Sequence, residues 1–277
     1  MFTMQPFRYL LAATTALLMS GTLTAQELFV FTEPASNMAA HSVGLRLNNY
    51  FASEATTSTK IEYHLVPEIM LGLSKHMMLH GDLFFSNRTG ELRGEGGSIY
   101  AKYRVLSMDA VQRHFRMAAF GRVSFNSSEL NQEEINLNGY NTGFELGLVS
   151  TQLLHKVALS SALSFANAAD NGYRHPFPYG RSNRNVMNFT FSAGRLMLPR
   201  QYTDYRQTNV NLMIELLGQY NPGPGKYYID AAPAVQFIFN SQGRIDIGLR
   251  KQVKTSMTRS ALESWLVRFE CNLFNAY

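Results

Sequence analysis

The sequence predicts an all-β protein, a membrane-spanning antiparallel up-and-down β-barrel of about twelve strands. Two observations at opposite ends of the chain predict this fold. Residues 265–277 alternate apolar and polar side chains down to a terminal aromatic residue, as expected for a strand with one lipid-facing side. Residues 1–25 have the composition of a cleavable export signal. A terminal aromatic strand on an exported protein is typical of a barrel inserted into an outer membrane.

The first 25 residues divide into the three parts of a signal peptide. Residues 1–8 hold a single cation, residues 9–19 are an apolar run, and residues 21–25 are small and neutral. A membrane anchor would need about 20 predominantly apolar residues, and this run is shorter. We therefore expect cleavage after Ala25, which leaves 26–277 as one barrel domain in the outer membrane of a Gram-negative bacterium.

The composition suits such a barrel. The chain has 19 Phe and 14 Tyr against one Trp, a load of aromatic residues that fits strands and interfacial girdles. The single cysteine, Cys271, excludes an internal disulfide framework, and its place on the apolar face of the last strand indicates a small apolar side chain rather than a reactive thiol. The net charge of +5 is spread without a Lys/Arg block, so nothing indicates a nucleic-acid partner.

Five alternating units fill the first half of the mature chain. In the first of them, Leu45 and Leu47 alternate with Arg46 and Asn48. The units of this half are 43–51, 61–74, 77–85, 98–105 and 114–125. Each is expected to cross a bilayer as a tilted strand. The polar sides carry charges and the apolar sides carry almost none, so the apolar side of each unit should face lipid.

The second half repeats the pattern with smaller polar residues. Its units are 143–148, 157–165, 187–197, 209–216, 229–239 and 245–250. With the terminal strand the count is about twelve, an even number as bacterial barrels require. Pro67 and Pro233 fall inside strand patterns, where each should mark a bulge or a bend.

The connections between these units alternate in length. Short connections are expected at 74–76, 153–156 and 240–243, and longer polar ones at 88–96, 126–139, 167–185, 221–225 and 251–260. Outer-membrane barrels have short periplasmic turns and long outer loops, which predicts the sidedness of the chain. The connections 107–112 and 198–206 are longer than periplasmic turns should be. Within 27–40, residues 28–31 could be a short strand or a plug inside the barrel.

The polar strand faces are expected to line the barrel interior, and they carry both signs of charge. The predicted lumen-lining residues are Arg46, Glu62, His64, Glu68, Asp82, Lys102, Arg104, Arg116, Arg122, Glu145, Glu215, Asp230, Asp246, Arg250, Arg268 and Glu270. Ionisable side chains at membrane depth must pair or meet water. They either line a wet passage and set its solute preference, or form a salt-bridge network that fills a narrow interior.

Metal binding and catalysis find little support in the sequence. His76, Met78 and His80 would share one strand face, and imidazole and thioether groups are good copper ligands, but interfacial or turn histidines without metal are the ordinary explanation. No metal site and no cofactor are therefore assigned. His175, in a long loop beside Asp170, lacks the serine spacing of barrel phospholipases, and no catalytic residue is predicted.

Five segments carry a resemblance to a known group. They are 28–38 (LFVFTEPASNM), 65–70 (LVPEIM), 114–121 (HFRMAAFG), 151–158 (TQLLHKVA) and 211–218 (NLMIELLG). Over nearly all its mature length the chain resembles uncharacterised outer-membrane β-barrel proteins of Bacteroidetes, a group without an established activity. More distantly it is similar to a barrel family named for a phenol-degradation pathway, whose members are regarded as channels. That resemblance concerns architecture, which does not imply function.

Together these observations predict a non-enzymatic channel or transporter for a small solute. The alternative is a structural or adhesive barrel that acts through its extracellular loops, with a barrel hydrolase as a further alternative. The expected partners are outer-membrane lipid, the barrel-assembly machinery and a small solute whose identity the sequence does not give.

Overall fold

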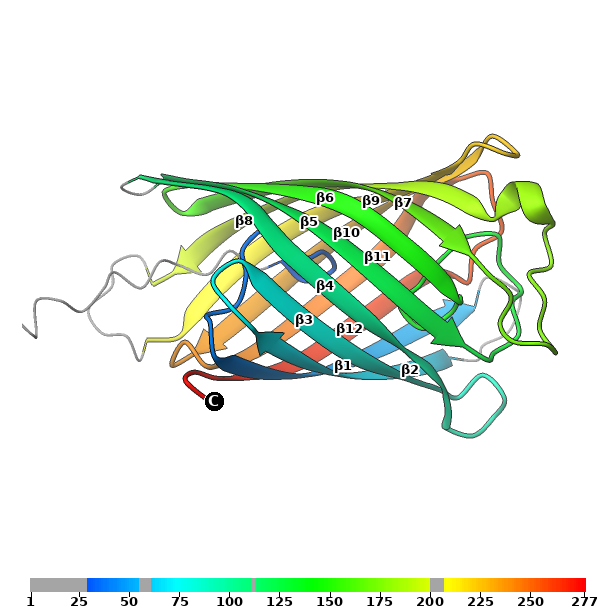
Figure 1. Ribbon diagram of the computed structural model, residues 1–277, viewed down its shortest axis with the longest axis horizontal. Coiled ribbons are helices and arrows are strands. Elements are labelled where there is room, and N and C mark those ends of the chain that lie inside the picture. Colours follow the sequence, from blue (N-terminus) through cyan, green and yellow to red (C-terminus); the bar gives the residue numbers. More distant parts are fainter. Residues whose placement is uncertain (1–28, 55–60, 111–112, 200–206) are drawn as a thin grey trace, which may run out of the picture.

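The computed structural model describes residues 29–54, 61–110, 113–199 and 207–277, and the predicted export signal lies outside them. It confirms the all-β fold: twelve antiparallel strands close into one barrel in chain order (Figure 1). The strands are β1 (Ser42–Glu54), β2 (Ile61–Gly72), β3 (Met77–Ser86), β4 (Arg93–Ala110), β5 (Arg113–Asn126), β6 (Gly143–Leu154), β7 (Val157–Ala168), β8 (Asn185–Leu198), β9 (Asn209–Asn221), β10 (Lys226–Phe239), β11 (Gly243–Thr255) and β12 (Ala261–Leu273). Among the described residues, no helix has the length and apolar character needed to span a membrane.

The barrel closes where β1 pairs with β12. Leu45 lies opposite Cys271 of β12 on one side and opposite Ile69 of β2 on the other. Every strand therefore has a neighbour on both sides, which pairs the backbone polar groups and leaves no open sheet edge. This closure is what allows strands to cross a region without water.

The period-two pattern of the sequence places apolar side chains outside and polar side chains inside. On β12, Trp265 and Phe269 are both 47% exposed on the outer face, whereas Leu266 between them is fully buried. Cys271 also points outward. The outer surface is thus a belt of exposed apolar side chains, which a bilayer would cover.

The connections alternate in length around the barrel with one exception: the connection 199–208 between β8 and β9, which the sequence also indicated to be long, is longer than the connection 222–225 that follows β9. Most of the short turns lie at the end where the C terminus lies, and the two longest loops, 127–142 and 169–184, lie at the opposite end (Figure 1). The expectation of a long connection at 107–112 is wrong, because β4 runs on to Ala110 and β5 begins at Arg113. The two strands continue as a paired hairpin, with Met108 opposite Phe115.

The prolines and the C terminus depart from their predicted local structure. The register does not shift at Pro67 or Pro233, so neither marks a bulge; instead the pairing of β2 with β3 and of β10 with β11 is interrupted there, because proline has no N–H to donate. The last strand ends at Leu273 rather than at the terminus. Tyr277 lies beyond it, where its hydroxyl donates to the carbonyl of Gly72 at 2.9 Å.

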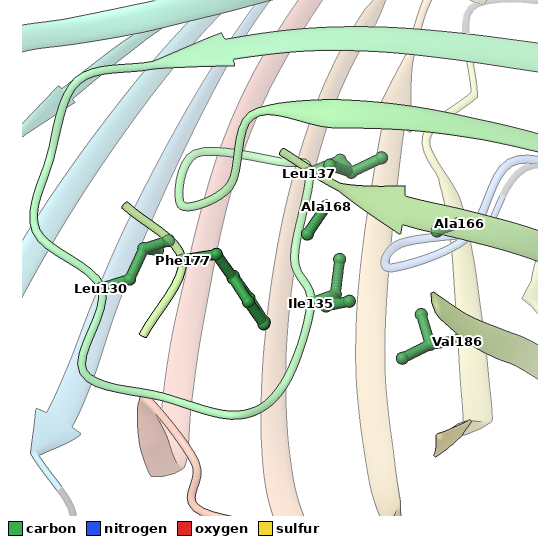
Figure 2. Packing of buried hydrophobic residues seen from close by; sticks show 7 residues of the cluster. All are labelled: Leu130, Ile135, Leu137, Ala166, Ala168, Phe177 and Val186. Carbon is green, nitrogen blue, oxygen red and sulfur yellow. The ribbon is translucent and has the colours of Figure 1, made fainter. Parts of the chain in front are cut away.

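Two segments that belong to no strand enter the barrel. Residues 29–38, which we call the plug, enter the barrel at the end with the short turns and lie inside it (Figure 1). Of the two interpretations of this segment, the plug is therefore correct and the short strand is wrong. The loop 127–142, which we call the inner loop, folds inward from the other end. Its apolar side chains pack against β7, β8 and the loop 169–184 (Figure 2). The residues of this cluster are Leu130, Ile135, Leu137, Ala166, Ala168, Phe177 and Val186.

The lipid-facing belt can be tested by the depth dependence of a charge. Leu163, at the middle of β7, is 55% exposed on the outer face, and Val157 lies on the same face at the start of the strand. Leu163→Arg should lower the free energy of unfolding by about 2 to 4 kcal/mol, and Val157→Arg by about 0 to 1 kcal/mol, because an interface hydrates the charge. Denaturant unfolding in lipid vesicles, followed by the fluorescence of Trp265, measures both. Equal losses would mean that this face meets protein.

Candidate functional site

The side chains predicted to line the lumen lie on strand faces that point into the barrel. The largest group surrounds the seam between β1 and β12 and contains Arg46, Glu68, Asp246, Arg268 and Glu270. Glu62 and His64 form a pair toward the longer loops, with His64 Nε2 at 2.6 Å from Glu62 Oε1. Arg104 and Arg116 lie near the end with the short turns. Asp82 lies 3.6 Å from Arg122. The other predicted residues contact the plug or line cavities above it: Lys102, Arg122, Glu145, Glu215, Asp230 and Arg250.

Arg46 is the centre of the seam group. Its Nε lies 2.8 Å from Glu270 of β12, and its Nη1 lies 3.1 Å from Glu68 of β2 and 2.8 Å from Glu33 of the plug. The Arg46 side chain is only 6% exposed. A buried guanidinium with three carboxylate partners keeps its charge compensated, so this residue joins the closing strands and the plug in one network.

Glu215 of β9 holds the start of the plug. Its Oε1 atom accepts hydrogen bonds from the backbone N–H groups of Val30 and Phe31, both at 2.8 Å, and its Oε2 accepts one from the Thr32 hydroxyl at 2.7 Å. Glu215 is fully buried. One carboxylate thus satisfies two backbone donors that no strand partner could reach.

Glu33 and Lys102 hold the middle of the plug. The Lys102 ammonium donates to the carbonyls of Pro34 at 2.6 Å and Ser36 at 2.9 Å and lies 3.8 Å from Glu33. Burial alone would raise the pKa of Glu33, but the charges of Arg46 and Lys102 outweigh it and hold the pKa of this carboxyl well below its usual range. Glu33 is therefore ionised at any physiological pH.

The end of the plug contacts β5 and β6. The Ala35 N–H donates to the Thr151 hydroxyl at 2.9 Å, and Arg116 donates to the Ser36 hydroxyl at 2.9 Å. Ala35 also packs against Ala118 and Val149. The plug is thus held by side chains from several parts of the barrel wall, and it occupies the lumen at the end with the short turns.

The inner loop fills the opposite end of the lumen. The amide of Gln219 on β9 pairs with the backbone of Ile135, accepting from its N–H at 2.9 Å and donating to its carbonyl at 2.8 Å. Glu134 forms a buried ion pair with Arg259, and Arg259 also donates to both oxygens of Asp230, at 2.8 and 2.7 Å. The loop is therefore bonded to the wall as tightly as the plug.

A series of cavities runs between the outer surface and the plug. The outer cavity, of about 550 Å³, shares Tyr140, Arg259 and Ser260 with a middle cavity of about 170 Å³. The middle cavity shares Asn138 and Arg250 with an inner cavity of about 250 Å³. Phe31, near the start of the plug, lines both the middle and the inner cavity. The upper lumen is thus polar and partly hollow, and the plug forms its floor.

The three candidate metal ligands do not come together. His76 lies in the turn before β3, where its ring nitrogen is 3.3 Å from the Arg104 carbonyl, whereas Met78 and His80 are buried inside the barrel. The predicted shared face is wrong because β3 begins only at Met77. His80 instead lies 2.6 Å from Glu68, and Glu33 completes a group with ligand-type atoms within 4.8 Å of one another. The cations beside these carboxylates already compensate their charge.

Several residues of the site were missed in the sequence. Glu33 lies in the segment 27–40, whose role the pattern left open, and Glu134 and Arg259 lie in connections that read as solvated loops. The period-two pattern that identifies strands gives no signal for a loop residue that folds into the barrel. Tyr100 and Tyr228, which share the parity of the polar residues of β4 and β10, could have been recognised as inward-facing by parity alone.

Comparisons with known proteins agree with this architecture. No family model matches the sequence, and neither does any curated protein. Among solved structures, the chain is similar to the KdgM porin, with a TM-score of 0.51 and 7% identity over 82% of this chain and 98% of that chain. It is also similar to the NanC porin, with a TM-score of 0.49 and 11% identity over 83% and 98% of the two chains. At such identities, the likeness to the KdgM porin shows a shared barrel fold.

Proposed function

We propose that this protein is a non-enzymatic passage for a small polar solute across the outer membrane of a Gram-negative bacterium, closed at rest by its plug. The observation that carries this proposal is the series of cavities, which leads from the outer surface to the plug between ionisable side chains. A barrel that served only as a scaffold would have no need of a hollow polar interior. The similarity in fold to the KdgM porin supports the proposal.

Passage would require the plug to leave its place. Its bonds to the wall are made by side chains such as Glu215, Thr151 and Lys102, while the barrel is held by its own strand ladder. The plug can therefore move without breaking the sheet. In the open state, the charged residues that now hold it would meet water and line the passage.

The alternative is a structural or adhesive barrel that acts through its outer loops. The loop 169–184 favours it, since Tyr173 there is wholly exposed while Phe177 anchors the same loop to the inner loop. In that case the plug would be a permanent filler. The resemblance to Bacteroidetes barrels does not choose between the two, because that group has no established activity.

The orientation of the barrel predicts a labelling pattern in intact cells. On a Cys271→Ser background, Thr89→Cys in the connection between β3 and β4 should react with a membrane-impermeant maleimide, because this connection lies at the end with the long loops. Ser74→Cys, in the turn between β2 and β3, should react only after the outer membrane is opened. If only Ser74→Cys were labelled in intact cells, the barrel would have the opposite orientation to the one expected.

Removal of the plug should open the passage. A variant that lacks residues 29–38 retains all twelve strands and should show stable conductance in a planar bilayer, whereas the full-length protein should be mostly closed. If the deletion variant folds, by circular dichroism and heat-modified electrophoretic mobility, yet remains silent, the passage is refuted and the structural alternative stands.

A disulfide that ties the plug to the wall should keep the passage closed. The Oγ atoms of Thr32 and Ser192 are 3.0 Å apart, so Thr32→Cys with Ser192→Cys on the Cys271→Ser background can form such a bond. The occasional openings of the reduced full-length protein should become rarer still under oxidising conditions and return on reduction. The matched control is Ser150→Cys with Ser161→Cys, whose Oγ atoms are also 3.0 Å apart but join β6 to β7 on the outer face. Equal conductance of the oxidised and reduced plug variant would show that the plug does not gate.

A further inference from the structure

The inner and middle cavities, together called the chamber, have a charge balance that restricts what they can bind. Arg122 lies 3.6 Å from Asp82, and Arg250 lies 2.7 Å from Asp230. In both pairs the carboxylate is nearly buried, at 3% and 1% exposed. Each guanidinium that faces the chamber thus has a counter-charge behind it, and a solute need not supply one.

The carboxylates of the chamber are balanced in a similar way. Glu33, at its floor, is paired with Arg46, and Glu134, at its roof, is paired with Arg259. Glu145 accepts hydrogen bonds from the Ser164 hydroxyl and the Asn188 amide, and it lies opposite Arg122 in the register of β5 and β6. Glu263, which also lines the middle cavity, lies 3.7 Å from Lys251. Each carboxylate that lines the chamber therefore has a cation or a hydrogen-bond donor beside it.

Hydrogen-bonding groups of both kinds alternate around the chamber wall. The Asn188 carbonyl oxygen accepts from Gln219 at 2.8 Å, and the Asn138 oxygen accepts from Arg122 at 3.2 Å. Thr190 also lines the inner cavity. Amide and hydroxyl groups each offer donors and acceptors, and a ligand hydroxyl, which is itself both donor and acceptor, is the group that such a wall satisfies best.

Aromatic rings stand on opposite sides of the chamber. On one side, Tyr100 and Phe120 pack with ring centroids 5.7 Å apart, and Arg122 lies over Tyr100 at 5.3 Å. Tyr228 lies on β10, six strands around the barrel from β4, with Arg250 over its ring at 5.5 Å. These guanidinium groups, with Arg259 at 3.7 Å from the Tyr228 centroid, cover faces of the two tyrosines. Phe31 and Phe120 also line the inner cavity, and the apolar faces of these two rings suit a solute ring that carries C–H groups on its faces and hydroxyls at its edge.

From this combination we infer that the chamber binds a neutral polyhydroxylated solute, a mono- or disaccharide, and this inference rests on the proposed passage. The cavities, of about 250 and 170 Å³, are small beside the ~300 to 1,000 Å³ of sites for drug-sized ligands, so each has room for little more than one sugar ring. To bind an acidic sugar, the chamber would need a guanidinium that is not already paired with a carboxylate. An amino sugar would need Glu145 to serve as its counter-ion.

The test is equilibrium binding to the full-length protein in detergent, by isothermal titration calorimetry with maltose, galacturonate and glucosamine as probes. Maltose should bind, with an affinity that changes little between low and high salt, because no net charge is matched. Tighter and salt-sensitive binding of galacturonate, tighter binding of glucosamine, or binding of none of the three would each overturn the inference.

Two phenylalanine substitutions on β8 place the binding in the chamber. Thr190→Phe fills the inner cavity and should raise the dissociation constant for maltose by at least ~10-fold. Ala193→Phe adds the same ring on the outer face of the same strand and should leave binding unchanged. Equal effects of the two variants would contradict a chamber site. Because binding is measured on the full-length protein and conductance on the plug-deletion variant, maltose binding together with a silent deletion variant refutes the passage alone, and conductance without maltose binding to the full-length protein refutes the chamber alone.

Discussion

The contacts of Arg46 join the parts of this barrel that the backbone alone does not hold together. The ladder between β1 and β12 closes the sheet, and Arg46 spans that seam to reach Glu270, then Glu68 on the other neighbouring strand and Glu33 in the plug. Arg244 and Arg268 extend the network through Glu270 and Asp246. Without the guanidinium, the buried carboxylates of Glu68 and Glu270 and the partly exposed Glu33 would lose their shared cation in a region of low dielectric, which costs more than the loss of a single exposed ion pair. Arg46 therefore links the seam to the plug, in addition to the backbone ladder and the other contacts of the plug.

The interior divides into a filled half and a hollow half. The difference follows from the number of backbone donors and acceptors in each half that wall side chains must bond. Around the plug, backbone donors and acceptors that have no strand partner must be bonded by wall side chains, and Glu215, Lys102 and Thr151 do so. Nearer the longer loops, the inner loop bonds to the wall at a few points such as Gln219 and Arg259, and the space between these points stays open. The half around the plug thus fits the interpretation of the lumen charges as a filling network, and the hollow half is the part that the proposed passage would use.

The strands could be predicted from the sequence and the inner segments could not, because the two depend on different information. A strand with one face in lipid imposes a period of two that any short window reveals, and the parity of that period placed Arg122 and Asp230 inside correctly. The plug and the inner loop are held by pairs far apart in sequence, such as Glu33 with Arg46 and Glu134 with Arg259, and no local pattern records such pairs. The errors at Pro67 and Pro233 have another cause, since a proline can interrupt a ladder without shifting its register. His76 was misplaced because the strand boundary lies one residue beyond it.

The way the plug is held bears on whether it could be a gate. A segment that is part of the barrel sheet could leave only by breaking the ladder, whereas the plug contributes few buried apolar side chains, chiefly Phe29, Val30 and Ala35, and is otherwise held by polar bonds to the wall. Polar bonds inside a lumen differ from those inside a core, because water can replace the departing partner and limit the cost of opening. Glu215 and Lys102, now at most 1% exposed, would then become hydrated lining of opposite charge. In the proposed passage, the same residues thus hold the plug in the closed state and line the lumen in the open state.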